Sequence, residues 1–105
     1  MSPDATAKLE EIVRRIVGVA QPDKIILFGS AARGEDHADS DLDLLVVKAG
    51  TNRRRVAESI YRSLIGVGRA VDIVVVTPED VERYGHSHAL VLAPALAEGI
   101  VLYAK

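Results

Sequence analysis

Three aspartates and a glycine–serine pair are the residues of this sequence whose types and spacing best suit chemistry. Asp41 and Asp43 stand two residues apart at the start of an apolar run, and the alternation of side chains along a strand places both on one face. Two carboxylates so close repel each other, and either protonation or a bound cation relieves the repulsion. Ligands that are all oxygen favour Mg²⁺ or Mn²⁺. The pair therefore predicts a divalent metal site.

Asp72 is the candidate third ligand. It lies between Val71 and Ile73 near the start of another apolar run, where a carboxylate is costly unless it is exposed, paired or bound to a metal. If the two runs form adjacent strands with their acids level, Asp41, Asp43 and Asp72 gather into one cluster.

Gly29 and Ser30 follow a third apolar run and predict a phosphate-binding turn. A residue without a side chain lets backbone amides approach a ligand closely, and the serine adds a hydroxyl beside them. Arg33, in the same polar stretch, is a candidate for contact with a triphosphate, and a surface salt bridge is the alternative.

Two other motifs share part of this pattern, but each is excluded because the sequence lacks residues that the motif requires. Gly29 and Gly34 have the separation of a P-loop, but Glu35 stands where that motif needs lysine. The alternating aspartates between 39 and 43 resemble an EF-hand calcium loop. That loop needs a glycine and a glutamate at the positions that Leu44 and Gly50 occupy.

Hydrophobic spacing predicts the elements that must position these residues. Helical spacing, with caps and breakers at the ends, predicts helices over residues 5–19, 51–64, 78–83 and 88–98. Asp4 is a candidate cap for the first helix, and Pro94 would kink or restart the last. Continuous apolar runs predict strands over residues 24–28, 42–47, 71–76 and 100–103. This alternation predicts an α/β (α+β) fold with a small mixed sheet of three to four strands flanked by helices.

Composition narrows the classes of function. The 105 residues, 49% of them hydrophobic, suit one core, so residues 1–105 are expected to form a single domain. A net charge of −2 provides no positive field for duplex nucleic acid, so a nucleotide is the expected ligand. The absence of cysteine excludes disulfides and thiolate metal sites. No apolar run approaches the ~20 residues of a membrane span, and we expect a cytoplasmic protein.

The combination of motifs resembles a known superfamily. Glycine–serine, ten intervening residues, the Asp41-Leu42-Asp43 pair and a later strand acid are similar to the pattern of the DNA polymerase β-like nucleotidyltransferases. The chain looks most like the minimal nucleotidyltransferases (MNT), which are often antitoxins of HEPN-domain toxins. The resemblance extends to Ala32-Arg33-Gly34 and to the ending over residues 95–103.

The resemblance implies a role for each residue of the site. Gly29 and Ser30 would hold the nucleotide phosphates, Asp41 and Asp43 would bind the metals, and Asp72 would complete the site and help to activate the attacking hydroxyl. The implied reaction transfers a nucleoside monophosphate, first of all AMP from ATP, to a hydroxyl of a partner protein. A HEPN toxin, held in a hetero-oligomer, is the expected partner. The alternatives are a non-catalytic module that masks its partner, and transfer to a small-molecule hydroxyl.

Several other polar residues each allow two interpretations. His37 could touch a ligand or be solvated, and Arg53-Arg54-Arg55 could contact phosphate or form a solvated helix face. Tyr61, Tyr84 and Tyr103 carry hydroxyls that such an enzyme could modify, although packing is the commoner role of tyrosine.

Overall fold

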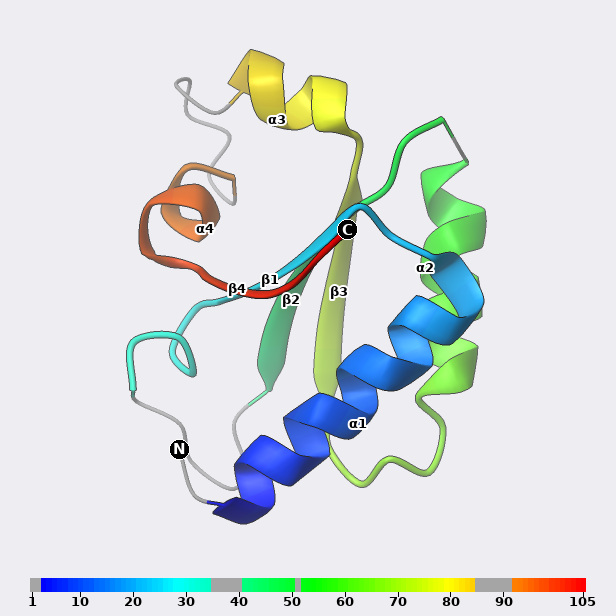
Figure 1. The fold of residues 1–105 in the computed structure, drawn as a ribbon, viewed down its shortest axis with the longest axis vertical. Coiled ribbons are helices and arrows are strands. Elements are labelled where there is room, and N and C mark those ends of the chain that lie inside the picture. The colour runs from blue at the N-terminus through cyan, green and yellow to red at the C-terminus, as the bar shows by residue number, and fades with distance from the viewer. Residues whose placement is uncertain (1–2, 35–40, 51, 85–91) are drawn as a thin grey trace.

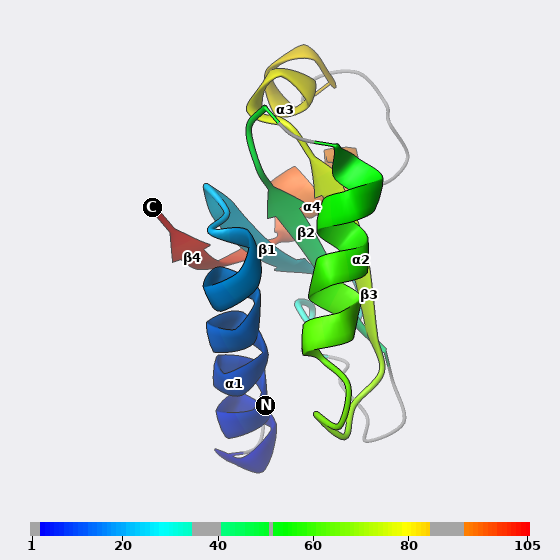
Figure 2. The ribbon, with the colours of Figure 1, turned by 90° about the vertical axis from the view of Figure 1, so that its right-hand side faces the viewer.

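The computed structural model describes residues 3–34, 41–50, 52–84 and 92–105. They form a four-stranded sheet between two layers of helices, as Figures 1 and 2 show. The helices are α1 (Pro3–Ala20), α2 (Arg53–Ser63), α3 (Pro78–Tyr84) and α4 (Leu92–Glu98). The strands are β1 (Lys24–Phe28), β2 (Leu42–Val47), β3 (Val71–Val76) and β4 (Ile100–Ala104). The fold class predicted from the sequence is confirmed.

The sheet is mixed, with the strand order β3-β2-β1-β4. Strand β1 is antiparallel to both β2 and β4, whereas β2 and β3 are parallel. Parallel neighbours need a long crossover, and α2 lies in the crossover between β2 and β3. The two central strands, β1 and β2, are nearly all apolar because helices cover both of their faces.

The structure differs from the prediction at the start of the first helix and describes only part of the last predicted helix. Helix α1 begins at Pro3, so Asp4 lies inside its first turn and the prediction that Asp4 caps it is wrong. Proline is preorganised for a first helical position, and an acid in the first turn still interacts favourably with the helix dipole. Helix α4 is described from Leu92 to Glu98, so Pro94 lies in its first described turn. Residues 88–91 of the predicted helix lie outside the described residues.

Short polar residues fix the starts of the other helices. The Arg55 backbone amide donates to Oδ1 of Asn52 over 3.2 Å, which caps α2. At α3 the Asp80 amide donates to Oγ1 of Thr77, and the Thr77 amide donates back to Oδ2 of Asp80, each over 3.0 Å. Both arrangements satisfy amides that a helix leaves without partners at its N-terminus.

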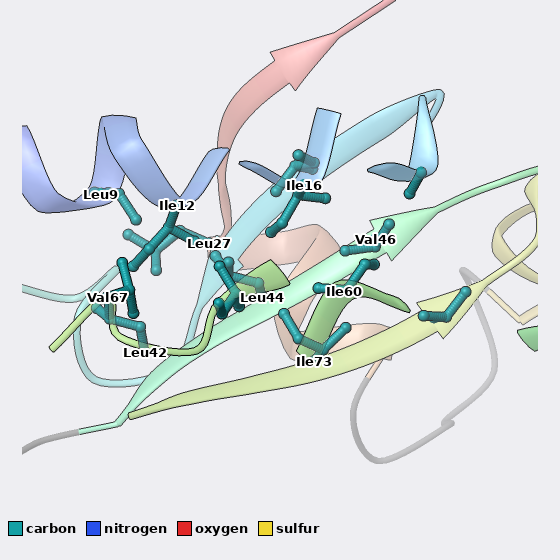
Figure 3. Packing of buried hydrophobic residues seen from close by; sticks show 14 of the residues in the cluster. Leu9, Ile12, Ile16, Leu27, Leu42, Leu44, Val46, Ile60, Val67 and Ile73 are labelled. Carbon is teal, nitrogen blue, oxygen red and sulfur yellow. The ribbon is translucent and has the colours of Figure 1, made fainter. Parts of the chain in front are cut away.

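The core has one cluster on each face of the sheet. Figure 3 shows the larger cluster, in which Ile12 and Ile16 of α1 and Ile60 of α2 pack against β1, β2 and β3. The smaller cluster joins Ile26 and other strand residues to Ala95 of α4. Among the described residues, every buried side chain of the core is apolar. No helix in the described part of the chain is long and apolar enough to cross a membrane.

Candidate active site

The register of the two parallel strands sets the candidate acids side by side. Asp43 of β2 lies directly across from Asp72 of β3, at the spacing of about 4.8 Å that separates adjacent strands. Asp41 precedes β2 by one residue and is exposed, as is Asp72. Asp41 lies two residues before Asp43, so the alternation of β2 continued by one residue would place it on the same side as Asp43. The sequence could not determine whether the acids lie at the same position along adjacent strands. Asp43 and Asp72 do.

Strand β1 brings Gly29 to the same corner of the sheet. Phe28 ends β1 opposite Asp43, so the next residue, Gly29, lies beside the Asp43 carboxylate. A methyl group on Gly29 would collide with Oδ2 of Asp43 and would stand 3.2 Å from its Cγ. Gly29 also has a φ angle of +75°, a conformation in which side chains are strained. The backbone conformation therefore favours glycine at this position, and a side chain here would also displace the Asp43 carboxylate.

A tight turn follows Gly29. The Arg33 amide donates to the carbonyls of Gly29 and Ser30, at 3.3 and 3.1 Å, and the Gly34 amide donates to Ala31 over 3.2 Å. The amides of Ser30 and Ala31 stand at the open N-terminal end of this turn, where no carbonyl of the turn can accept from them. Together with the half-buried Ser30, they are the groups of this site that could donate to phosphate oxygens.

Electrostatics support the proximity of the three acids. Burial, the Asp72 carboxylate and the Asp41 carboxylate, in that order, raise the pKa of Asp43 above its ordinary value. Two of these three causes are like charges, and like charges favour the protonated form of a carboxyl. The same repulsion would favour a divalent cation.

The chemistry of the donor set suits Mg²⁺ or Mn²⁺, because carboxylate oxygens are the ligands that these ions prefer. As they stand, the described side chains form no group of three or more acids or histidines arranged to hold a metal ion. Repulsion between anions favours rotamers that keep the carboxylates apart, and the Asp43 carboxylate is turned over Gly29. Asp41, Asp43 and Asp72 share one corner of the sheet without forming a closed metal cage.

Arg33, the other predicted ligand of the nucleotide, has an ion-pair partner in the structure. Its Nη1 lies 3.7 Å from Oε2 of Glu98 at the end of α4, and both side chains are about half exposed. The salt bridge that the sequence left as the alternative is therefore present. A surface pair of this kind is weak, so Arg33 could still exchange Glu98 for a phosphate.

Two contact partners near the site were not named from the sequence. The backbone amide of Ile73, next to Asp72, donates to the hydroxyl of Tyr61 over 2.9 Å, and the ion-pair partner of Arg33 is Glu98. The sequence singled out Tyr61 only for its hydroxyl, as a group that such an enzyme could modify. Arg53 contacts Asp80 over 3.2 Å. His37 lies outside the described residues.

Comparison with known proteins identifies the family. A model of the nucleotidyltransferase domain matches residues 6–70, which is more than half of the chain. The match includes Gly29, Ser30, Asp41 and Asp43, and ends two residues before Asp72. A search of curated protein sequences gave no match.

Solved structures share the fold over most of the chain. A candidate nucleotidyltransferase from Sulfolobus solfataricus is 20% identical, with a TM-score of 0.64 over 94% of this chain and 79% of that one. A toxin–antitoxin crystal structure with AMP-PNP is 25% identical, with a TM-score of 0.57 over 91% and 73%. A complex of a tri-AMPylated Shewanella oneidensis HEPN toxin with its MNT antitoxin is 21% identical, with a TM-score of 0.53 over 94% and 69%.

These similarities are consistent with the arrangement of the candidate acids, Gly29 and the turn that follows it. The chain belongs to the nucleotidyltransferase domain family and has the polymerase β-like fold of its minimal members.

Proposed function

We propose that this protein transfers a nucleoside monophosphate, AMP from ATP in the first instance, to a hydroxyl of a partner protein, and that a divalent metal is required. The observation that carries the proposal is the parallel register of Asp43 with Asp72, with Gly29 packed against the Asp43 carboxylate. A phosphate-binding turn and a pair of level acids at one corner suit the binding of a metal–triphosphate.

The proposed division of labour follows from the positions of the groups. Asp41, Asp43 and Asp72 would hold Mg²⁺ or Mn²⁺, and the turn that begins at Gly29 and Ser30 would hold the phosphates. When bound, divalent ions stabilise the charge on the attacking and leaving oxygens of an in-line displacement. The acceptor hydroxyl oxygen bonds to the α-phosphorus while the bond from that phosphorus to the bridging oxygen breaks, and pyrophosphate leaves. We assign to Asp72 the acceptance of the hydroxyl proton.

The partner is proposed from the similar structures. One is a toxin–antitoxin complex with AMP-PNP, and another holds an AMPylated HEPN toxin with an MNT antitoxin. Asp41 and Asp72 are exposed, which leaves room for a second protein to bring its hydroxyl to them. We therefore propose a HEPN-family protein as the acceptor, held with this chain in a hetero-oligomer and neutralised by modification.

A label-transfer assay tests the chemistry. The protein is incubated with Mg²⁺, a purified HEPN-family partner and ATP labelled at either the α- or the γ-phosphate. We expect label on the partner from α-labelled ATP alone, no transfer by Asp41→Asn/Asp43→Asn, and normal transfer by Asp4→Asn, an exposed acid of α1. Circular dichroism of each variant checks folding. Transfer of the γ-label, or equal transfer by the double variant, would refute the proposal.

A growth assay separates modification from masking. Co-expression of the partner with the wild type should relieve growth arrest, whereas co-expression with Asp41→Asn/Asp43→Asn should not, although the complex still co-purifies. If the double variant still restores growth, masking and not catalysis is the neutralising activity.

A further inference from the structure

The outer edge of β3 is held by a residue of the crossover helix. Among the described strands, β3 ends the sheet and pairs with β2 alone, so alternate backbone groups of β3 point away from these strands. One of them, the Ile73 amide, donates to the Tyr61 hydroxyl over 2.9 Å. Tyr61 therefore takes the place of a missing neighbour at one point of this edge.

That point adjoins the candidate active site. The Ile73 amide belongs to the same planar peptide unit as the Asp72 carbonyl, so a bond that fixes this amide restricts the backbone of Asp72. On the other side, β2 pairs with β3, and the Leu42 amide donates to the carbonyl of Ala70 over 3.0 Å just before β3. The start of β3 is thus held from both sides, by β2 and by Tyr61.

Packing alone accounts poorly for a tyrosine at this position. The Tyr61 side chain is 45% exposed, whereas its neighbour in sequence, Ile60, is completely buried. Its specific contact is made by the hydroxyl. Transfer of a nucleotide to that hydroxyl is not supported either. Ile73, which the hydroxyl contacts, faces the core on the α1–α2 side, whereas Asp72, one residue away, faces the opposite side of the sheet.

We propose that Tyr61 is a positioning residue for Asp72. It holds the peptide unit that carries the Asp72 carboxylate to the level of Asp43, and so keeps the acids spaced for a divalent metal. This inference rests on the proposed function, because the spacing of the acids matters for a metal only if they bind one.

Tyr61→Phe tests the proposal because it keeps the ring and removes only the hydroxyl. The matched control is Tyr103→Phe, which removes a hydroxyl from the edge strand at the other side of the sheet. Amide hydrogen exchange followed by NMR should show faster exchange at Ile73 in Tyr61→Phe only. Calorimetric titration of the full chain with Mn²⁺, without nucleotide, should show affinity about tenfold weaker, the lower end of the loss seen when groups that orient metal ligands are removed. High Mn²⁺ should restore transfer by Tyr61→Phe.

The outcomes distinguish a failure of the positioning role of Tyr61 from a failure of the metal site. If Tyr61→Phe binds Mn²⁺ as the wild type does while Asp43→Asn does not bind it, the positioning role is wrong and the metal site stands. If the wild type and Asp43→Asn give the same titration, the metal site itself is wrong and the positioning role falls with it. A transfer defect that saturating Mn²⁺ does not rescue would also overturn the positioning role, since it would reflect a general structural loss.

Discussion

At the scale of single residues, the most constrained position of the site is Gly29, because its backbone conformation strains a side chain and a side chain there would also displace the Asp43 carboxylate. Gly34 shares only the first constraint. Its φ angle is +79°, close to the +75° of Gly29, but a methyl group at Gly34 would meet no atom within 4 Å. Alanine substitutions at the two glycines therefore distinguish the effect of backbone strain from the effect of displacing the Asp43 carboxylate.

We expect Gly34→Ala to lower the free energy of unfolding by roughly 1–2 kcal/mol, the cost of a left-handed conformation for a residue with a side chain. Gly29→Ala should lose at least as much stability. It should also lose about 100-fold in transfer rate, because a displacement of about 1 Å at a reacting centre costs that much. Urea unfolding and the α-label assay measure the two effects. Similar transfer rates for the two variants would contradict the role of the Gly29–Asp43 contact.

The residues of the candidate site could be predicted from the sequence, but the contacts between them could not. Asp-x-Asp after a polar stretch predicted two acids on one face, since strand alternation is a local property. The level register of Asp43 with Asp72 depends on pairing across a crossover, which no local pattern specifies. The salt bridge of Arg33 with Glu98 joins residues 65 positions apart in the sequence. The sequence predicted a surface salt bridge as one alternative for Arg33, but it could not identify the partner.

At the scale of elements, α2 is held by one buried stripe whose centre is Ile60. Ile60 is completely buried, whereas Ile65, just beyond the helix, is 75% exposed. We expect Ile60→Ala to lower the free energy of unfolding by about 2–5 kcal/mol, the range for truncation of a core side chain. Ile65→Ala should change it by less than about 0.5 kcal/mol. Chemical denaturation of both variants checks the contrast, and equal losses would contradict the packing of α2.

The start of α3 predicts a dependence of stability on pH. The Thr77 backbone amide, the Thr77 hydroxyl and the charges of Arg53 and Arg83 lower the pKa of Asp80, and they outweigh an opposing effect of burial. A carboxyl whose pKa is lower when folded contributes stability above its unfolded pKa of about 3.9 and loses it as the pH falls through the folded pKa.

Asp80→Asn should therefore be less stable than the wild type at pH 7, by about 0.3–1 kcal/mol for an acid at a helix N-terminus. The difference should disappear in acid below the folded pKa. Urea unfolding at a series of pH values measures it, with Glu58→Gln, an exposed acid in the middle of α2, as the control. A difference that persists unchanged in strong acid would rule out the charge of Asp80 as its source.

Most elements were predictable because their signals are local. The strands over residues 24–28, 42–47 and 71–76 have the predicted bounds, since continuous apolar runs between polar breakers leave little choice. The start of α1 was misplaced because Pro3 suits a first helical position as well as Asp4 suits a cap. The place of β4 beside β1 was not predicted, because edge position depends on which strand is left unpaired after the others have formed.

At the scale of the whole molecule, we expect the clustered acids to lower the stability of the metal-free protein. Asp43 carries a charge close to two others at a partly buried position, so its removal should stabilise the metal-free protein. We expect Asp43→Asn to raise the free energy of unfolding in EDTA by about 0.5–2 kcal/mol, as is common for relief of a strained functional site. Mn²⁺ at 100 times its Kd should stabilise the wild type by about 2.7 kcal/mol and leave Asp43→Asn unchanged. Thermal unfolding with and without Mn²⁺ measures both effects, and equal responses of the two proteins would exclude Asp43 as a ligand.

Parallel pairing of β2 with β3 also sets the order in which the chain can fold. Parallel neighbours cannot be joined by a tight turn, so Asp43 and Asp72 meet only after the whole crossover with α2 has closed. Pairing between residues distant in sequence is already the slow part of folding, and here the same step brings two carboxylates together. We therefore expect repulsion between the two carboxylates to slow this pairing, and a divalent cation bound between them to relieve the repulsion.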